Sequence, residues 1–270
     1  MTHSRTAMLP HRSPVLLLSL VLSLVVGLTP ATAQSVESIV DDMRAQYEQQ
    51  FKAVDTYIVE TNLYTSYHRK ASGQKSSYQT QTKMKGAGVS SFTSSTTVSS
   101  AYGLQFDQLK KHATYTGTEM IDGMQCHVLQ VDDPSKVNSE MGGKAESMTY
   151  YVHADRLVPA RMVVTNTRST QDGQQPSSVT IDLKNYTTTD GLTLPHRMDI
   201  HLDANISEKQ RKQMKRAMRK LENLPEQKRK QMEKMMGSQM EMMKRIMSGD
   251  PITINVQRVK VNAEIPKGIF

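Results

Sequence analysis

The sequence is poor in several residue types that stabilise folded proteins. In 270 residues it has one cysteine, Cys126, no tryptophan and four phenylalanines. A lone thiol cannot form an internal disulfide, so Cys126 is expected to be a small buried hydrophobic residue. Hydrophobic residues make up 37% of the chain, and with the glycines added they stay below the ~45–50% of ordinary globular proteins. Such a chain has a thin core or leaves apolar surface for another molecule to cover.

Motifs that carry catalysis are also missing from the sequence. It contains no glycine-rich phosphate loop, no nucleophile elbow and no histidine pair at the helical spacing of a metal site. His196 and His201 are five residues apart on a predicted strand, so their side chains are expected on opposite faces. The same holds for the neighbours Cys126 and His127. The sequence therefore predicts no enzyme, with no catalytic residue, no metal site and no cofactor.

The N-terminal apolar run is too short to cross a membrane. It extends over 14 residues from Val15 to Leu28, whereas a spanning helix needs roughly 18 or more. Basic residues precede the run, and Ala31-Thr32-Ala33 follows it, which is the layout of a secretory signal. We expect residues 1–33 to be a cleavable signal peptide and the mature protein to be periplasmic in a bacterium.

The net charge of +8 belongs to one segment. Residues 206–248 hold thirteen Lys and Arg and five Glu, which is 13 − 5 = +8, and the signal adds +2 through Arg5 and Arg12. The remainder of the chain therefore sums to 8 − 8 − 2 = −2. Export and a nearly neutral body exclude a nucleic-acid-binding protein. The basic segment favours an anionic membrane surface or an acidic polypeptide as its partner.

Two periodicities follow the signal. Ser35 is placed to cap an amphipathic helix whose apolar positions recur at spacings of three and four, namely Val36, Ile39, Val40, Met43 and Tyr47. The period then changes to two, and one extended segment is predicted with Tyr57, Val59, Thr61, Leu63, Thr65 and Tyr67 on one side. The helix is one-sided and needs a surface to lie on.

Three Asp-Gly pairs punctuate the middle of the chain and favour tight hairpin turns: Asp122-Gly123, Asp172-Gly173 and Asp190-Gly191. The strand-like runs beside them are residues 112–120, 124–131, 146–153, 157–167, 179–186 and 192–202. The last strand, 252–261, slips phase at Gln257-Arg258, which predicts a β-bulge. Together with the segment at 57–67 and the weaker, Ser/Thr-rich alternations at 78–84 and 89–102, these runs predict a mainly β (α+β) fold. It is an antiparallel meander of about ten strands without parallel crossovers.

A helical hairpin is predicted to interrupt this meander between residues 206 and 249. The phrase ISEKQRKQM at 206–214 is echoed by LPEQKRKQM at 224–232. Ser207 and Gln210 form a capping box, Pro225 suits a helix start, and Gly249 and Pro251 stop the second helix. Helices are therefore expected at 208–222 and 225–247. Nine of the nineteen methionines lie in this insert.

The methionines of the second helix have three interpretations. They can pack against the first helix and the sheet, or close as a flexible lid over an apolar cavity, because Met adapts to varied partners. Thioethers also suit Cu(I), but no histidine follows Asn205, and the stripe is longer than a copper site needs. The lid interpretation assigns ligand contacts to Met232, Met235, Met236, Met240, Met243 and Met247.

Four phrases outside the insert carry a family resemblance. They are GTEMIDGMQCHVLQVDD, YYVHADRLVPARMVV, VTIDLKNYTTTDGLTLPHRMDI and VQRVKVNAEIP. With the signal peptide, the first helix and the meander, they resemble the LolA-like family of outer-membrane lipoprotein-sorting proteins. The resemblance covers most of residues 34–270 apart from the insert. It implies a curved antiparallel half-barrel whose apolar concave side, partly covered by helices, carries acyl chains. The insert is similar to helical periplasmic chaperones of the Spy and CpxP type.

These observations predict a monomeric, non-enzymatic periplasmic carrier for acyl chains of lipoproteins or lipids. The concave side is expected to bind them through Tyr57, Val59 and Leu63, with the Met stripe above. The alternative is a holdase chaperone or envelope-stress sensor that uses the basic hairpin to bind unfolded outer-membrane proteins. In a third possibility the hairpin docks on an anionic membrane or an inner-membrane transport partner.

Overall fold

The computed structural model describes residues 34–71, 77–85, 91–92, 97–98, 105–138, 145–170, 173–203 and 248–270. Between residues 203 and 248 it describes only 212, 216, 219, 223–228, 230, 244 and 245. The predicted signal peptide, residues 1–33, lies outside the described residues. So do the six methionines to which ligand contacts were assigned, Met232, Met235, Met236, Met240, Met243 and Met247.

Strands dominate the fold, in agreement with the predicted class. The helices are α1 (Val36–Phe51), α2 (Phe106–His112) and α3 (Pro134–Val137). The strands are β1 (Thr56–Thr61), β2 (Tyr64–Lys70), β3 (Tyr78–Met84), β4 (Ser91–Phe92), β5 (Thr97–Val98), β6 (Thr114–Ile121), β7 (Met124–Val131), β8 (Ser147–His153), β9 (Pro159–Thr170), β10 (Gly173–Thr189), β11 (Leu192–Asp203) and β12 (Ile252–Val261).

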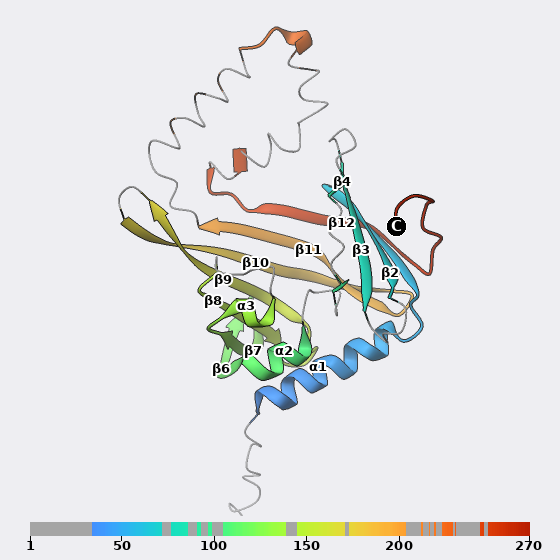
Figure 1. Ribbon diagram of the computed structural model, residues 1–270, viewed down its shortest axis with the longest axis vertical. Coiled ribbons are helices and arrows are strands. Elements are labelled where there is room, and N and C mark those ends of the chain that lie inside the picture. Colours follow the sequence, from blue (N-terminus) through green and yellow to red (C-terminus); the bar gives the residue numbers. More distant parts are fainter. Residues whose placement is uncertain are drawn as a thin grey trace, which may run out of the picture. The chain divides into compact units, whose positions relative to one another are not determined.

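All twelve strands belong to one antiparallel sheet (Figure 1). Its order is β4-β3-β2-β1-β12-β11-β10-β9-β8-β7-β6, and β5 also pairs with β3. Among the described strands no pairing joins β6 to β4, so the sheet is an open, curved half-barrel. Strand β12 enters between β1 and β11, which connects the start of the sheet to its middle. The expected meander of about ten strands is confirmed.

Helix α1 covers one face of the sheet and forms the main core with it. Ser35 and Ser38 make the predicted N-terminal cap through reciprocal hydrogen bonds. The buried positions of the helix are Ile39, Val40, Met43, Tyr47 and Phe51. They join one hydrophobic cluster with strand residues, among them Tyr57, Tyr78, Leu129, Met148, Tyr150, Leu192 and Leu194. We call the face that α1 covers the inner face of the sheet.

Two of the predicted Asp-Gly turns are confirmed. Asp122-Gly123 connects β6 to β7, and Asp190-Gly191 connects β10 to β11, with positive φ at all four residues. Positive φ at both central residues matches the right-handed twist of paired strands. The third turn includes Asp172, which lies outside the described residues, although β9 and β10 pair antiparallel up to Thr170 and Gly173. The predicted bulge in β12 is also confirmed, since Val256 pairs with Thr61 and Arg258 with Glu60.

The single extended segment predicted from Tyr57 to Tyr67 is wrong. It forms two strands, β1 and β2, which turn back at Asn62-Leu63 without glycine or proline. The Thr61 hydroxyl accepts hydrogen bonds from the backbone N–H of Leu63 and Tyr64, and the Asn62 side chain bonds to the backbone of β12. Side chains therefore stabilise a reversal that residue-type preferences did not indicate.

Helix α2 was not predicted either. Its Phe106 and Leu109 are buried three residues apart, and its last turn is basic, which favours a helix C-terminus. In the insert, the few described residues include a turn at Asn223-Leu224 and helical backbone at Glu226–Lys228. Lys230 forms an ion pair with Glu226 one turn earlier, at 2.8 Å. Gly249, with a φ of 79°, precedes β12 where the insert was expected to end.

Candidate functional site

The strand register assigns every side chain of β9–β12 to one face of the sheet. Directly paired residues share a face and successive residues alternate. On the inner face, Ile181 is opposite Ile200, and Ile200 is opposite Ile252. Similarly, Met198 is opposite Ile254, and Val179 is opposite Leu202. Aliphatic residues therefore adjoin one another across three neighbouring strands.

We call this set the inner apolar patch, and it consists of Val179, Ile181, Met198, Ile200, Leu202, Ile252, Ile254 and Val256. None of these residues belongs to the main hydrophobic cluster under α1. Ile252 and Ile254 are 8% exposed, whereas the others are half-buried or, at Leu202, 37% exposed. Met162 and Val164 of β9 connect the patch to the main cluster. The inner face thus has a sealed half under α1 and a less protected half beside the insertion point.

The inner positions of these strands are uncharged. Within the described ranges 162–166, 179–189, 192–202 and 252–261, no inward position of β9–β12 holds Lys, Arg, Asp or Glu. An apolar surface gains about 25 cal/mol for each Å² of area that it removes from water, and a nearby charge would oppose such burial. The inner apolar patch therefore suits a ligand whose buried part is hydrocarbon.

Two histidines lie on the inner face. On β2, His68 stacks on the Tyr57 ring at 4.0 Å and contacts Ser66 and Thr80 through its two ring nitrogens. Burial lowers the pKa of His68 to about 3, so this ring is neutral at physiological pH. On β11, the Nε2 atom of His196 is buried and has no hydrogen-bond partner among the described residues. The His68 ring therefore adds no charge to the inner face.

The outer face of the same strands carries a dense charge network. Asp182 and Asp199 are paired across β10 and β11, and both are 3% exposed. Arg161 donates to Asp182 at 2.5 Å, and Arg197 donates to both oxygens of Asp199 at 3.0 Å. The ammonium of Lys184 lies 3.8 Å from Asp182 and 3.7 Å from Asp199. Three cations thus compensate two adjacent buried carboxylates, and the sheet is apolar inside and ionic outside.

Burial raises the pKa of Asp199, but hydrogen bonds from Arg197 and Thr253 lower it by more, so that the pKa falls below its ordinary value. A carboxyl whose pKa is depressed by folding stabilises the protein above its ordinary pKa, about 4, and loses that contribution as the pH falls through the folded value. The outer charge network is therefore expected to weaken in acid.

Asp199→Asn is expected to lower the free energy of unfolding by about 2 kcal/mol at pH 7, because charge-assisted hydrogen bonds are lost in a buried setting. Urea unfolding of both proteins at pH values from 7 to 3 measures this loss of stability. The difference in unfolding free energy between wild type and variant should shrink below about pH 4, because the Asp199 carboxyl of the unfolded chain becomes protonated there. A difference that stays constant across this range would contradict the assignment.

The sequence-predicted contact residues lie in three different settings. Tyr57 is 2% exposed inside the main cluster, between Phe51, Tyr78 and His68. Val59 is half-buried at the margin of that cluster. Leu63 is half-buried in the turn between β1 and β2. The predicted methionines of the insert lie outside the described residues.

The residues of the inner apolar patch were not assigned to a site from the sequence. Their strands were predicted, but the apolar positions of β10, β11 and β12 were not recognised as a common surface. Alternation at 179, 181 and 183 and at 198, 200 and 202, with Asp182 and Asp199 between, was the available signal. These positions form one surface because β12, which follows the insert in the chain, pairs with β11, which precedes it.

Among the residues described, no three His, Cys, Asp or Glu side chains are grouped as metal ligands would be. Cys126 is fully buried with a free thiol, as predicted, and burial raises its pKa. Within the described part of the chain, no helix combines the length and apolar character of a transmembrane helix.

The sequence matches no protein-family model, and no curated protein matches it. Among solved structures, the chain is similar to a DUF1329 family protein from Desulfovibrio piger, with a TM-score of 0.46 and 9% identity over 86% of this chain and 95% of that one. A domain from Vibrio parahaemolyticus, assigned as an outer membrane lipoprotein-sorting protein, has a TM-score of 0.44 and 10% identity over 86% of this chain and 94% of that one.

A LolA superfamily protein from Nitrosomonas europaea has a TM-score of 0.39 and 10% identity, over 88% of this chain and 98% of that one. At these identities the likeness is one of fold.

Proposed function

We propose that this protein is a non-enzymatic periplasmic carrier that binds acyl chains of lipids or lipoproteins on the inner apolar patch. The single observation that carries the proposal is the two-sided sheet. Eight aliphatic residues adjoin one another on the inner positions of β10–β12, outside the main core, while the outer positions of these strands are ionic. A hydrocarbon ligand matches that surface better than a polar one does.

Burial of hydrocarbon alone can supply enough free energy for such a site to bind an acyl chain, without hydrogen bonds to the ligand. Each methylene moved out of water contributes about 0.8 kcal/mol, so eight sheltered methylenes give roughly 6 kcal/mol before the cost of association is subtracted. Selectivity among chains of similar length would be low. Delivery to a membrane requires this kind of reversible, non-directional binding.

The proposal includes the insert as a movable cover for the patch. The insert leaves the sheet after Asp203, one residue beyond the exposed Leu202, and returns at Ile252, a member of the patch. Its methionines suit contact with hydrocarbon, and its excess of basic residues suits an anionic membrane surface. In this proposal residues 1–33 direct export and are removed.

Extraction of lipid from protein purified out of the periplasm tests the carrier function. The expected result is copurified lipid in the full chain and in a variant lacking residues 206–248, with faster loss of lipid from the deletion variant. The holdase alternative predicts a different result: the deletion variant should no longer suppress the aggregation of outer-membrane proteins. Lipid-free protein under gentle purification would contradict the carrier proposal.

A further inference from the structure

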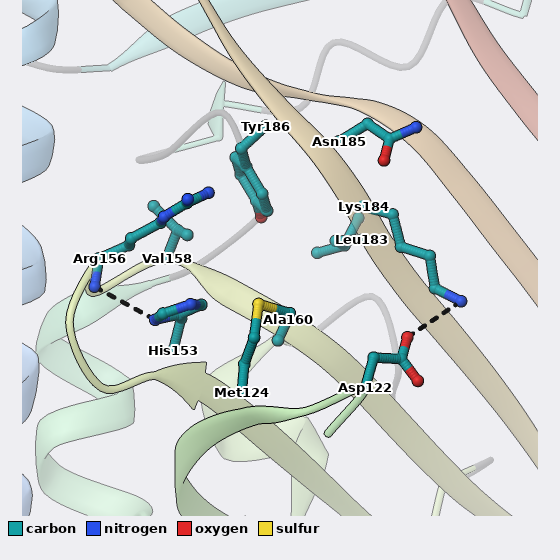
Figure 2. Close-up of a pocket in the computed structure, with 10 residues that line it drawn as sticks. All are labelled: Asp122, Met124, His153, Arg156, Val158, Ala160, Leu183, Lys184, Asn185 and Tyr186. Carbon is teal, nitrogen blue, oxygen red and sulfur yellow. Dashed lines mark hydrogen bonds and ion pairs between the residues drawn. The ribbon is translucent and has the colours of Figure 1, made fainter. Parts of the chain in front are cut away.

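A pocket lies where β9 separates from β10. The two strands pair from Gly173 and Thr170 as far as Asp182 and Arg161, and beyond that point β10 continues beside β11 alone. The gap opens a pocket of about 330 Å³ between β10, the start of β7 and the turn from β8 to β9 (Figure 2). This volume is at the lower end of the range for small-molecule sites. The pocket adjoins the inner apolar patch at Leu183, which is opposite Met198 in the strand register.

The floor of the pocket is apolar and its rim is polar. Met124, Val158, Ala160 and Leu183 supply the hydrocarbon surface, and Val158, Ala160 and Leu183 are themselves buried. At one side, Lys184 is bound to Asp122 at 3.1 Å, as Figure 2 shows, so these two charges satisfy each other. Because these two charges already satisfy each other, a ligand on this side of the pocket has only the apolar floor to contact, so its body should be hydrocarbon.

His153 presents a hydrogen-bond donor to this pocket. The ring is 8% exposed, and its Nδ1 accepts hydrogen bonds from the backbone N–H of Asp155 and Arg156 at 3.2 and 3.3 Å. Because a backbone N–H can only donate, Nδ1 acts as the acceptor and the ring N–H is at Nε2. That nitrogen points into the pocket in Figure 2, and no described residue accepts its hydrogen bond. A donor that faces a pocket and has no partner among the described residues is available to a ligand.

The charge at the rim indicates which kind of acceptor suits this donor. Arg156 lines the pocket on the same side as the His153 ring, and no described carboxylate forms an ion pair with its guanidinium. By contrast Lys184 is surrounded by Asp122, Asp182 and Asp199 within 4 Å. The uncompensated charge beside the free donor is therefore positive, and it favours an anionic oxygen over a neutral one.

We propose that this pocket binds a small amphipathic carboxylate. Its carboxylate accepts a hydrogen bond from His153 Nε2 and faces the Arg156 guanidinium, while a short hydrocarbon tail lies on Met124, Val158, Ala160 and Leu183. The site is distinct from the inner apolar patch, because its polar contacts are to His153 and Arg156, although Leu183 of the pocket is opposite Met198 of the patch. It makes the protein a receptor for a small molecule in addition to its carrier role.

Octanoate is the probe for this site, and the methyl signal of Met124 in an NMR titration of the full chain is the readout. Octanoate should shift this signal in a saturable manner. Its affinity should fall about tenfold in Arg156→Gln and in His153→Gln, the loss of one charge-assisted hydrogen bond or ion pair. The neutral analogue 1-octanol should also bind about tenfold more weakly to the wild-type protein. Arg258→Gln, which removes an exposed cation on β12, is the matched control and should leave the affinity unchanged.

Ile200→Asp separates this site from the inner apolar patch. The substitution should leave the octanoate-induced shift of Met124 intact even where binding of long acyl chains is lost. An unshifted Met124 signal, equal affinities for octanoate and 1-octanol, or an unaltered affinity in Arg156→Gln would each overturn the proposal. Because Arg156 is exposed, its substitution tests the site even if His153→Gln disturbs folding.

Discussion

Ile200→Asp is expected to reduce the affinity for a long-chain fatty acid at least tenfold. Ile200 lies at the centre of the inner apolar patch, between Ile181 on β10 and Ile252 on β12. A carboxylate there must either stay hydrated, which keeps water against the ligand, or be buried at a cost of several kcal/mol. Displacement of a fluorescent fatty acid by palmitate measures the change.

The matched control for this variant is Asn255→Asp. Asn255 is exposed on β12 and pairs with Arg197 on the outer face, so the same new charge is placed on the other side of the same sheet. It should leave acyl binding within a factor of two. Unfolding curves of both variants establish that each is folded. Equal binding by Ile200→Asp and wild-type protein would exclude the inner apolar patch as the ligand surface.

Phe51→Ala is expected to lower the free energy of unfolding by about 3–5 kcal/mol, the largest change in stability that we predict. Phe51 is 0% exposed at the end of α1, and its ring contacts Tyr47 at 4.3 Å, Tyr78 at 5.4 Å and Tyr57 at 5.6 Å between centroids. Removing the ring leaves a cavity where the helix, β1 and β3 meet. Urea unfolding monitored by circular dichroism measures the loss.

Met120→Ala provides the comparison for this prediction. Met120 is 65% exposed on β6, and its truncation should change the stability by no more than about 0.5 kcal/mol. The chain has few aromatic residues, and the cluster around Phe51 gathers several of them at one place. Equal effects from the two substitutions would mean that α1 is not anchored through Phe51.

Much of the architecture could be predicted because local signals and tertiary structure agree. The Ser35 cap, the Asp-Gly turns at 122–123 and 190–191 and the bulge near Gln257 each depend on a few neighbouring residues, and each is found as predicted. The turn at Asn62-Leu63 was missed because it contains neither glycine nor proline and because the Asn62 side chain bonds to β12, 191 and 193 residues away in the chain. Such contacts leave no local pattern.

The candidate site was harder to predict than the fold for the same reason. Alternation shows that a strand has an apolar side, but not which strands are neighbours. Ile200 and Ile252 adjoin only because β12 pairs with β11 after the insert. The pocket beside His153 depends on the end of pairing between β9 and β10, and the tautomer of His153 depends on two backbone groups in a turn. Neither has a signature in the sequence.

The most direct test of the carrier account is photocrosslinking with a palmitate that carries a photoreactive group in the middle of its chain, followed by peptide mapping of the full-length protein. The account predicts saturable adducts in residues 179–202 and 252–256, competed by unlabelled palmitate and lost in Ile200→Asp. Adducts confined to other segments, or labelling that unlabelled palmitate does not compete, would contradict it.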